Sequence, residues 1–326
     1  MTYSLWKLAR EASAPVECGE LWAKTGDRPI VGMLGIGELG NGTIVVALQD
    51  QLGVGHLEQL NTATCRTASI REFAQEEFAM NGMARMADGG GLLVGQNRLV
   101  RVDGGGSVLW SRKLADVPDL VLLEGVSLAS GGFVLAGTQM RRERTPQVGE
   151  ELANLWIGKV SEDAKLIKQE VFKGRMVSIT PVGQEGFLAV HDGATGHPFD
   201  LKVSREIGTK RLGGDLAVLQ TRRLFTTAGG SFRSRFRVAG GAGGVFVVAG
   251  HREQKPWIAS LNGTGEVVQV IEATARSRFE MVSALDLVGA GREFFAIYTV
   301  GINKGEGVAA PVERVVRILK LRVTDD

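Results

Sequence analysis

The side chains with the clearest chemical potential in this sequence are arginines grouped in short segments. Three of the four residues at 141–144 are arginine, and residues 233–237 alternate arginine with serine and phenylalanine. A guanidinium group binds carboxylate or phosphate through paired hydrogen bonds. These segments therefore predict a surface that binds an anionic partner. The arginines that we assign to this surface are Arg141, Arg142, Arg144, Arg222, Arg223, Arg233, Arg235 and Arg237.

The alternating segment 233–237 constrains where its arginines can lie. In a strand of period two, Arg233, Arg235 and Arg237 would share one face. Burying three unpaired cations would be very costly. We therefore expect this face to lie toward the mouth of a channel, toward water, or against acidic residues such as Asp215 or Glu280.

The four histidines are the other residues that could perform chemistry near neutral pH. None of them occurs in a His-x-His or His-Glu-x-x-His pattern, and each is expected in or beside a loop. We interpret them as exposed loop residues and assign His191 and His251 to the binding surface. Cys18 and Cys65 are the only cysteines and form no zinc-binding pattern, so we expect reduced thiols, no metal site and no cofactor.

Motifs for catalysis or nucleic-acid binding are absent from the sequence. Residues 35–40 spell G-x-G-x-x-G, but no helical pattern follows, so the match carries no dinucleotide site. The formal net charge is only +2 and aromatic residues make up 6%, which argues against nucleic acid as a partner. We assign no catalytic residue.

A β-hairpin at Leu99–Leu114 sets the frame that positions these residues. An alternating strand leads into the turn Asp103–Gly106, and a second strand returns with Trp110. Similar units recur about every 40 to 55 residues, each with four short strands, which is typical of a β-propeller. We predict an all-β propeller of six four-stranded antiparallel blades, with seven as the alternative. The expected single domain, 1–326, has blades at about 30–81, 82–124, 125–176, 177–235, 236–281 and 282–326.

The two ends of the chain complement each other in this scheme. Residues 1–29 contain strand-like segments without a first half of a blade, and the final unit lacks an evident fourth strand. We expect the N-terminal segment to join the last blade and close the ring, because an open sheet edge promotes aggregation.

Residues 101–110 (Arg-Val-Asp-Gly-Gly-Gly-Ser-Val-Leu-Trp) resemble the repeat of quinoprotein-like (PQQ-type) propellers, within the wider group that includes WD40-like repeats. The segments Trp156–Val160 and Trp257–Leu261 look like third strands of related bacterial propellers. The resemblance implies the fold. The quinone enzymes of this family use a disulfide between adjacent cysteines and a calcium site. The resemblance does not imply quinone chemistry here, because Cys18 and Cys65 are not adjacent and no Asp/Glu/Asn cluster indicates calcium.

Propeller topology predicts which face carries function. Turns between strands one and two, and between three and four, share one face and are short and glycine-rich here; we call it the tight-turn face. The opposite, long-loop face carries the irregular segments, where binding is usually located. We expect long loops at 138–153, 191–198, 251–255 and 301–311, and inter-blade connections at 115–124 and 213–235.

We therefore predict a non-catalytic propeller that binds an acidic protein through its long-loop face, for example a bacterial immunity protein that neutralises a toxin. The alternatives are a lactonase- or lyase-like enzyme acting on an anionic small molecule, and a structural scaffold. The sequence favours binding over catalysis, because the predicted inner strands carry almost no ligand-type side chains. We expect a monomer when unbound, no membrane insertion and a cytoplasmic location, or a periplasmic one if a signal peptide has been removed.

Overall fold

The computed structural model describes twenty segments of the chain, and all structural statements below concern them. They are residues 17–20, 24–25, 28–39, 43–50, 52, 54–61, 66–73, 81–86, 88–95, 97–114, 117–144, 149–183, 186–193, 205–227, 236–241, 244–252, 255–272, 280–290, 293–303 and 312–322. Within these segments no helix is long and apolar enough to cross a membrane.

The described strands form six antiparallel sheets, five with four strands and one with five. The five-stranded sheet contains β2 (Lys24–Thr25), β3 (Arg28–Glu38), β4 (Ile44–Asp50), β5 (Gly55–Asn61) and β6 (Arg66–Phe73). The next sheet contains β7 (Gly82–Arg85), β8 (Gly91–Gly95), β9 (Arg98–Val102) and β10 (Val108–Lys113). The third contains β11 (Leu120–Ser127), β12 (Phe133–Arg144), β13 (Gly149–Val160) and β14 (Leu166–Lys173).

The remaining sheets follow the same order along the chain. The fourth contains β15 (Arg175–Val182), β16 (Gly186–Asp192), β17 (Arg205–Leu212) and β18 (Val218–Thr227). The fifth contains β19 (Arg237–Gly240), β20 (Phe246–Arg252), β21 (Lys255–Leu261) and β22 (Val267–Glu272). The last contains β23 (Glu280–Ala290), β24 (Glu293–Asn303), β25 (Val312–Arg322) and β1 (Glu17–Glu20).

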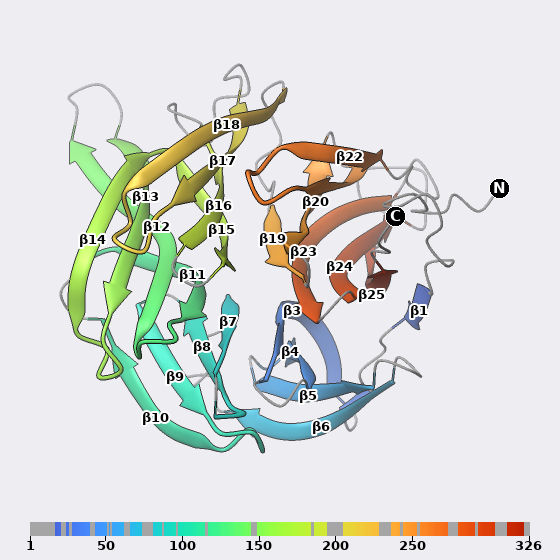
Figure 1. Cartoon of the computed structure of the whole chain (residues 1–326). Helices are drawn as coiled ribbons and strands as arrows, with labels where there is room; N and C mark the ends of the chain where they lie inside the picture. The colour runs from blue at the N-terminus through green and yellow to red at the C-terminus, as the bar shows by residue number, and fades with distance from the viewer. Residues whose placement is uncertain are drawn as a thin grey trace.

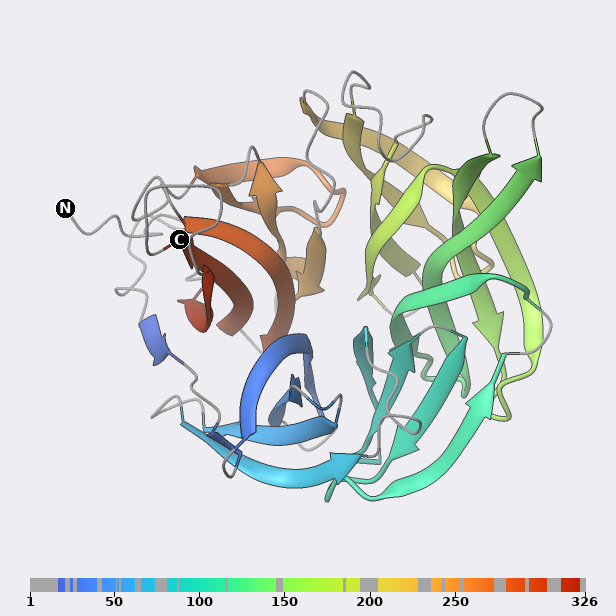
Figure 2. The ribbon, with the colours of Figure 1, turned by 180° about the vertical axis from the view of Figure 1, so that it is seen from behind.

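The sheets are arranged around a central axis as a β-propeller (Figures 1 and 2). The inner strands β3, β7, β11, β15, β19 and β23 contact one another in that order, and β23 also contacts β3. The predicted number of six four-stranded blades is wrong, because only five sheets have four strands. In the remaining sheet β2 adds a fifth strand by pairing with the start of β3, Lys24 opposite Pro29. The N-terminal strand β1 pairs with β25, Glu17 opposite Leu319 and Glu20 opposite Arg317.

The core lies between the sheets, where the two apolar faces of each blade meet the neighbouring blades. The second strands β8 and β16 are buried along their whole length. The cluster between the sheets of β7–β10 and β11–β14 contains the fully buried Trp156, whose indole N–H donates to Gln169 Oε1 at 2.7 Å. A second cluster packs Phe225, Phe236 and Trp257 with ring centroids 4.7–5.9 Å apart. Aromatic packing of this kind fixes neighbouring blades relative to each other.

Outer strands are linked to the following blade by polar contacts that repeat around the ring. Arg112 of β10 donates to the carbonyl and carboxylate of Asp163, in the turn between β13 and β14. Lys168 of β14 donates to the carbonyl of Asp215, in the turn between β17 and β18. Arg222 of β18 pairs with Glu266 at 2.9 Å, beside the turn between β21 and β22. The same structural position therefore joins three successive pairs of blades.

Two predicted loop regions are strands in the structure. Residues 138–144 and 149–153 belong to an extended hairpin, in which β12 and β13 pair from Phe133 opposite Val160 to Arg144 opposite Gly149. Residues 218–227, expected as an inter-blade connection, form β18 and pair with β17. Both segments are rich in charged and polar residues, so they lack the apolar alternation from which a strand can be recognised.

Candidate functional site

The described residues enclose a cavity of about 1000 Å³ on the axis of the propeller. All six inner strands contribute to its wall, and each does so with the end that leads into the first turn of its blade. Part of its rim is formed by residues in and beside these turns: Met86, Asp88, Leu128, Ala129, Gly131, Gly132, Gly240, Gly241 and Gly244. The cavity therefore opens on the tight-turn face, opposite to the face on which the sequence predicts the site.

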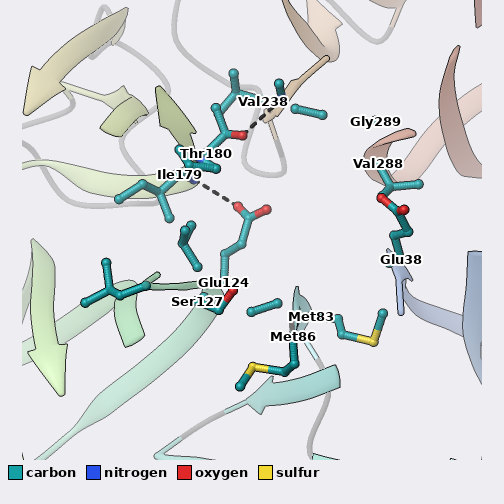
Figure 3. A pocket seen from close by; sticks show the side chains of 18 of the residues that line it. Glu38, Met83, Met86, Glu124, Ser127, Ile179, Thr180, Val238, Val288 and Gly289 are labelled. Atoms are coloured by element: carbon teal, nitrogen blue, oxygen red, sulfur yellow. Dashed lines mark hydrogen bonds between the residues drawn. The ribbon is translucent and has the colours of Figure 1, made fainter. Parts of the chain in front are cut away.

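Glu124 of β11 is held rigidly in the wall of this cavity. Its Oε2 accepts hydrogen bonds from the hydroxyl of Ser178 and from the backbone N–H of Ile179, the latter at 2.9 Å, both on the neighbouring β15. The Ser178 hydroxyl in turn accepts from the N–H of Val238 at 3.0 Å, on β19. One hydroxyl therefore connects three inner strands and orients the carboxylate, which points into the cavity in Figure 3.

A second carboxylate, that of Glu38 at the end of β3, lines the cavity on another side of the view in Figure 3, where it lies beside Val288. Asp88 and Glu162 lie at the rim. Asp88 is paired with the buried Arg101, and this hydrogen bond together with the N–H of Gly90 holds the pKa of Asp88 below its ordinary value. Among the residues described here, those that line the cavity include no lysine, arginine or histidine.

The rest of the lining is apolar or small. Met83 and Met86 lie together on one side in Figure 3. The uncharged hydroxyl of Thr180 accepts from the N–H of Gly240 at 3.0 Å. Phe246 is the one aromatic residue among the described lining residues. Methionine side chains adapt to irregular shapes, so this wall suits an aliphatic chain better than a rigid sugar ring.

The side chain of Arg237 extends across the propeller axis, and Arg237 directly precedes the part of β19 that lines the cavity. It precedes Val238 on β19, and its guanidinium donates to the carbonyl of Asn81 at 2.8 Å, just before β7 on the opposite side of the ring. The side-chain amide of Asn81 also donates to the carbonyl of Leu122 at 2.8 Å. Arg237 is only 3% exposed, so the alternative in which its side chain faces water is wrong; the side chain lies across the axis and donates to a backbone carbonyl.

The interpretation of the histidines as exposed loop residues is wrong for the two whose side chains are described. His56 lies on β5 and is 1% exposed, with Nε2 3.5 Å from Asp50 Oδ2 and Nδ1 3.8 Å from Glu72 Oε1. His191 lies on β16 and is 6% exposed. His251 lies on β20, but its side chain is not described, and His197 lies outside the described residues. Within the described part of the chain, no group of His, Cys, Asp or Glu residues could hold a metal ion.

The arginines at 141–144 lie on the extended hairpin, at the end of β12 farthest from the cavity. The opposing strand β13 places Glu150 and Glu151 opposite Glu143 and Arg142. Residues 141–152 thus contain three arginines and three glutamates, so their formal charges cancel. The sequence prediction considered one strand of this hairpin and missed the charges that the other strand supplies.

The other predicted arginines are not gathered into one patch. Arg222 and Arg223 lie on the outermost strand β18, where Arg222 pairs with Glu266 and Arg223 is exposed, whereas Arg237 lies on the innermost strand β19. Arg233 and Arg235 lie outside the described residues. No sequence signal marks the cavity, because its walls come from six separate strands and consist mainly of glycine, alanine and valine.

Comparisons with known proteins support the fold and do not identify a family. No protein-family model matches the sequence, and no curated protein matches it. Solved structures do match. The α-L-arabinofuranosidase of family GH93 from Fusarium graminearum, solved with arabinobiose, has a TM-score of 0.56 at 11% identity and covers 95% of this chain and 98% of its own. The Dos1 propeller matches with a TM-score of 0.51 at 9% identity, covering 93% and 81%, and U3-55K with 0.50 at 10% identity, covering 89% and 80%.

These similarities agree with the architecture described above. The chain is a β-propeller, and its similarity to the solved structures holds at the level of the fold alone.

Proposed function

We propose that this chain is a non-catalytic binding propeller whose axial cavity receives a cationic group from a protein partner, such as the end of an arginine or lysine side chain. One observation carries the proposal. Glu38 and Glu124 line the cavity, while its described lining contains no cationic side chain. A carboxylate at the end of a recessed, partly apolar site attracts a cation more strongly than one on an open surface.

The wall chemistry supports a side chain that combines an aliphatic stem with a charged end. Met83, Met86 and Val238 offer apolar contact along the wall, and the carboxylates lie among them. Lysine and arginine place their methylene groups along apolar surface in this way and present the charge beyond it. Glu124 is preorganised by Ser178 and Ile179, so little side-chain entropy is lost when it binds.

A second candidate function is favoured by the same pair of carboxylates. Most glycosidases cleave their substrates between two Asp or Glu residues that flank the scissile bond. Glu38 and Glu124 face one cavity, and the arabinofuranosidase of similar fold was solved with arabinobiose. Release of nitrophenol from p-nitrophenyl glycosides, lost in both Glu38→Gln and Glu124→Gln, would support this alternative over simple binding.

The acidic partner predicted from the arginines, including the role as an immunity protein, remains a separate hypothesis. Its support is the exposed Arg223 together with the arginines outside the described residues, Arg233 and Arg235. The balanced charges of residues 141–152 and the pairing of Arg222 with Glu266 weaken it. An acidic small-molecule substrate in the cavity is disfavoured as well, because the carboxylates would repel it.

The experiment that separates these hypotheses measures peptide binding by fluorescence anisotropy. A labelled arginine-rich hexapeptide and a glutamate-rich one are titrated with wild type, Glu38→Gln, Glu124→Gln and the control Glu170→Gln, which removes a carboxylate on the outer strand β14. A charge-assisted hydrogen bond is worth about 1.5–3 kcal/mol, so each cavity variant should weaken binding of the arginine peptide about 10-fold or more. Preference for the glutamate peptide, or equal effects of the cavity and control variants, would contradict the proposal.

We also propose that the pairing of β1 with β25 closes the ring. The contact between β23 and β3 supports this proposal, because it joins the last sheet to the first at the inner strands while β1 completes the outer edge of the last sheet.

A further inference from the structure

His191 occupies an unusual position between two blades. It lies on β16, opposite Met176 of β15 and Gly208 of β17. Phe187 and Ala189 on the same strand belong to the apolar cluster shared with β11, β12 and β13, and strand alternation places His191 on that same side. The ring therefore faces the joint between the sheet of β11–β14 and the sheet of β15–β18.

Among the described residues, none forms a hydrogen bond with this imidazole that would stabilise a positive charge. Nδ1 and Nε2 both lack a partner there, and the residue is only 6% exposed. Gly208 leaves space for the ring, since a Cβ there would lie 3.1 Å from Nε2. A buried polar group without a partner already carries a cost, and adding a charge raises that cost further.

The charged groups around His191 come from four strands. On β17, Lys210 lies 5.4 Å above the ring of Phe172 from β14, and Glu206 is exposed. On β16 itself the neighbour is the buried Asp192. On β18, Arg222 pairs with Glu266, and the exposed Arg223 lies opposite Gly208. On β14 the charged residues are the exposed Lys168 and Lys173 and the half-buried Glu170, which pairs with Lys168.

The titration behaviour agrees with this geometry. Burial, followed by the positive charge of Lys210, lowers the pKa of His191 to about 4. Burial also lowers the pKa of Lys210, an effect that Glu206 partly opposes. In the folded joint both groups therefore resist protonation, whereas in an opened joint His191 would be exposed and would have the ordinary imidazole pKa of about 6.5.

We propose that His191 is a pH-sensitive element that loosens the joint between the sheets of β11–β14 and β15–β18 when it is protonated. The direction follows from proton linkage. The folded pKa lies below the unfolded one, so the joint is fully stable above about pH 6.5 and loses stability as the pH falls toward 4. Because the opened joint binds the extra proton, the opening equilibrium should rise by up to tenfold for each pH unit across this window.

Hydrogen exchange measured by mass spectrometry at pH 7.0, 6.0 and 5.0 tests the proposal, with protection factors corrected for intrinsic rates. In wild type, protection in β13–β17 should fall by about tenfold per unit below pH 6.5, while β20 and β21 in the same molecule stay protected. His191→Leu should abolish the pH dependence in β13–β17, and Lys210→Met should reduce it.

Two results would overturn the proposal. One is a His191→Leu variant that loses protection with pH as wild type does. The other is a wild-type protein in which β13–β17 and β20–β21 lose protection together, because the opening is then global. If His191→Leu does not fold, the NMR titration of the His191 ring in the wild-type protein gives the decision: no protonation above pH 5 in the folded state supports the proposal, and titration near 6.5 overturns it.

Discussion

The substitution Ser178→Ala offers the sharpest test of how the cavity wall is held together. The Ser178 hydroxyl is buried, donates to Glu124 and accepts from the N–H of Val238 at 3.0 Å. Alanine removes both interactions and leaves the Val238 N–H without this partner. An unpaired buried donor costs about 1–3 kcal/mol, and a lost hydrogen bond to a carboxylate costs about 1.5–3 kcal/mol. Because the two effects share one atom and are not additive, we expect a total of about 2–4 kcal/mol.

The assay is urea unfolding at pH 7, followed by tryptophan fluorescence, with Ser107→Ala as the matched control. Ser107 is exposed in the turn before β10, so its hydroxyl should contribute less than about 0.5 kcal/mol. Ser178→Ala should also weaken binding of the arginine-rich peptide, since it releases Glu124 from its fixed orientation. Equal stability of the two alanine variants would refute the reasoning, because it would show that the serine does not join the three inner strands.

Three further predictions concern other parts of the molecule. Arg237→Ala should destabilise the protein by about 2–4 kcal/mol in urea unfolding, because it removes the hydrogen bond to Asn81 across the axis. The control Arg223→Ala, on the outer strand, should change stability by less than about 0.5 kcal/mol, and similar values for the two variants would contradict the role of Arg237. Gly132→Ala should reduce the stability of the protein by about 1–3 kcal/mol more than Gly244→Ala does. Both glycines have positive φ (78° and 74°), but only at Gly132 would a Cβ meet a backbone oxygen, 2.3 Å away. Equal shifts of the melting temperature would show that the backbone relaxes freely there. Deleting residues 1–20 should lower the melting temperature and cause concentration-dependent light scattering, because β25 loses its outer partner β1 and becomes an open sheet edge. An unchanged melting curve would argue against ring closure by this strand.

Much of the fold could be predicted because apolar alternation and glycine turns mark the buried strands. The hairpin at 99–114 became β9 and β10, and the unit from residue 236 became β19 to β22 close to the predicted bounds. These segments combine buried residues at period two with turns that need glycine. The pairing of the N-terminal segment with the last sheet also followed from the missing fourth strand there.

The failures occurred where a strand carries few apolar residues or where distant segments meet. The end of the β12–β13 hairpin near Arg144 and Gly149, and the outer strand β18, are held by ladder hydrogen bonds, so their polar residues gave no strand signal. Arg237 was expected near water because an isolated buried charge is costly, yet the carbonyl of Asn81 lies across the axis to receive it. The cavity could not be predicted at all, since Glu38 and Glu124 are separated by two blades' worth of sequence and carry no motif.

Methyl NMR of the methionines tests the central claim most directly. Met83 and Met86 line the cavity, and the remaining methionines serve as internal controls. Titration of ¹³C-methyl-labelled protein with the arginine-rich peptide should shift the Met83 and Met86 resonances saturably, and the Glu38→Gln/Glu124→Gln double variant should lose the shifts. Unchanged Met83 and Met86 resonances, or shifts produced only by the glutamate-rich peptide, would contradict the assignment of the axial cavity as a site for a cationic group.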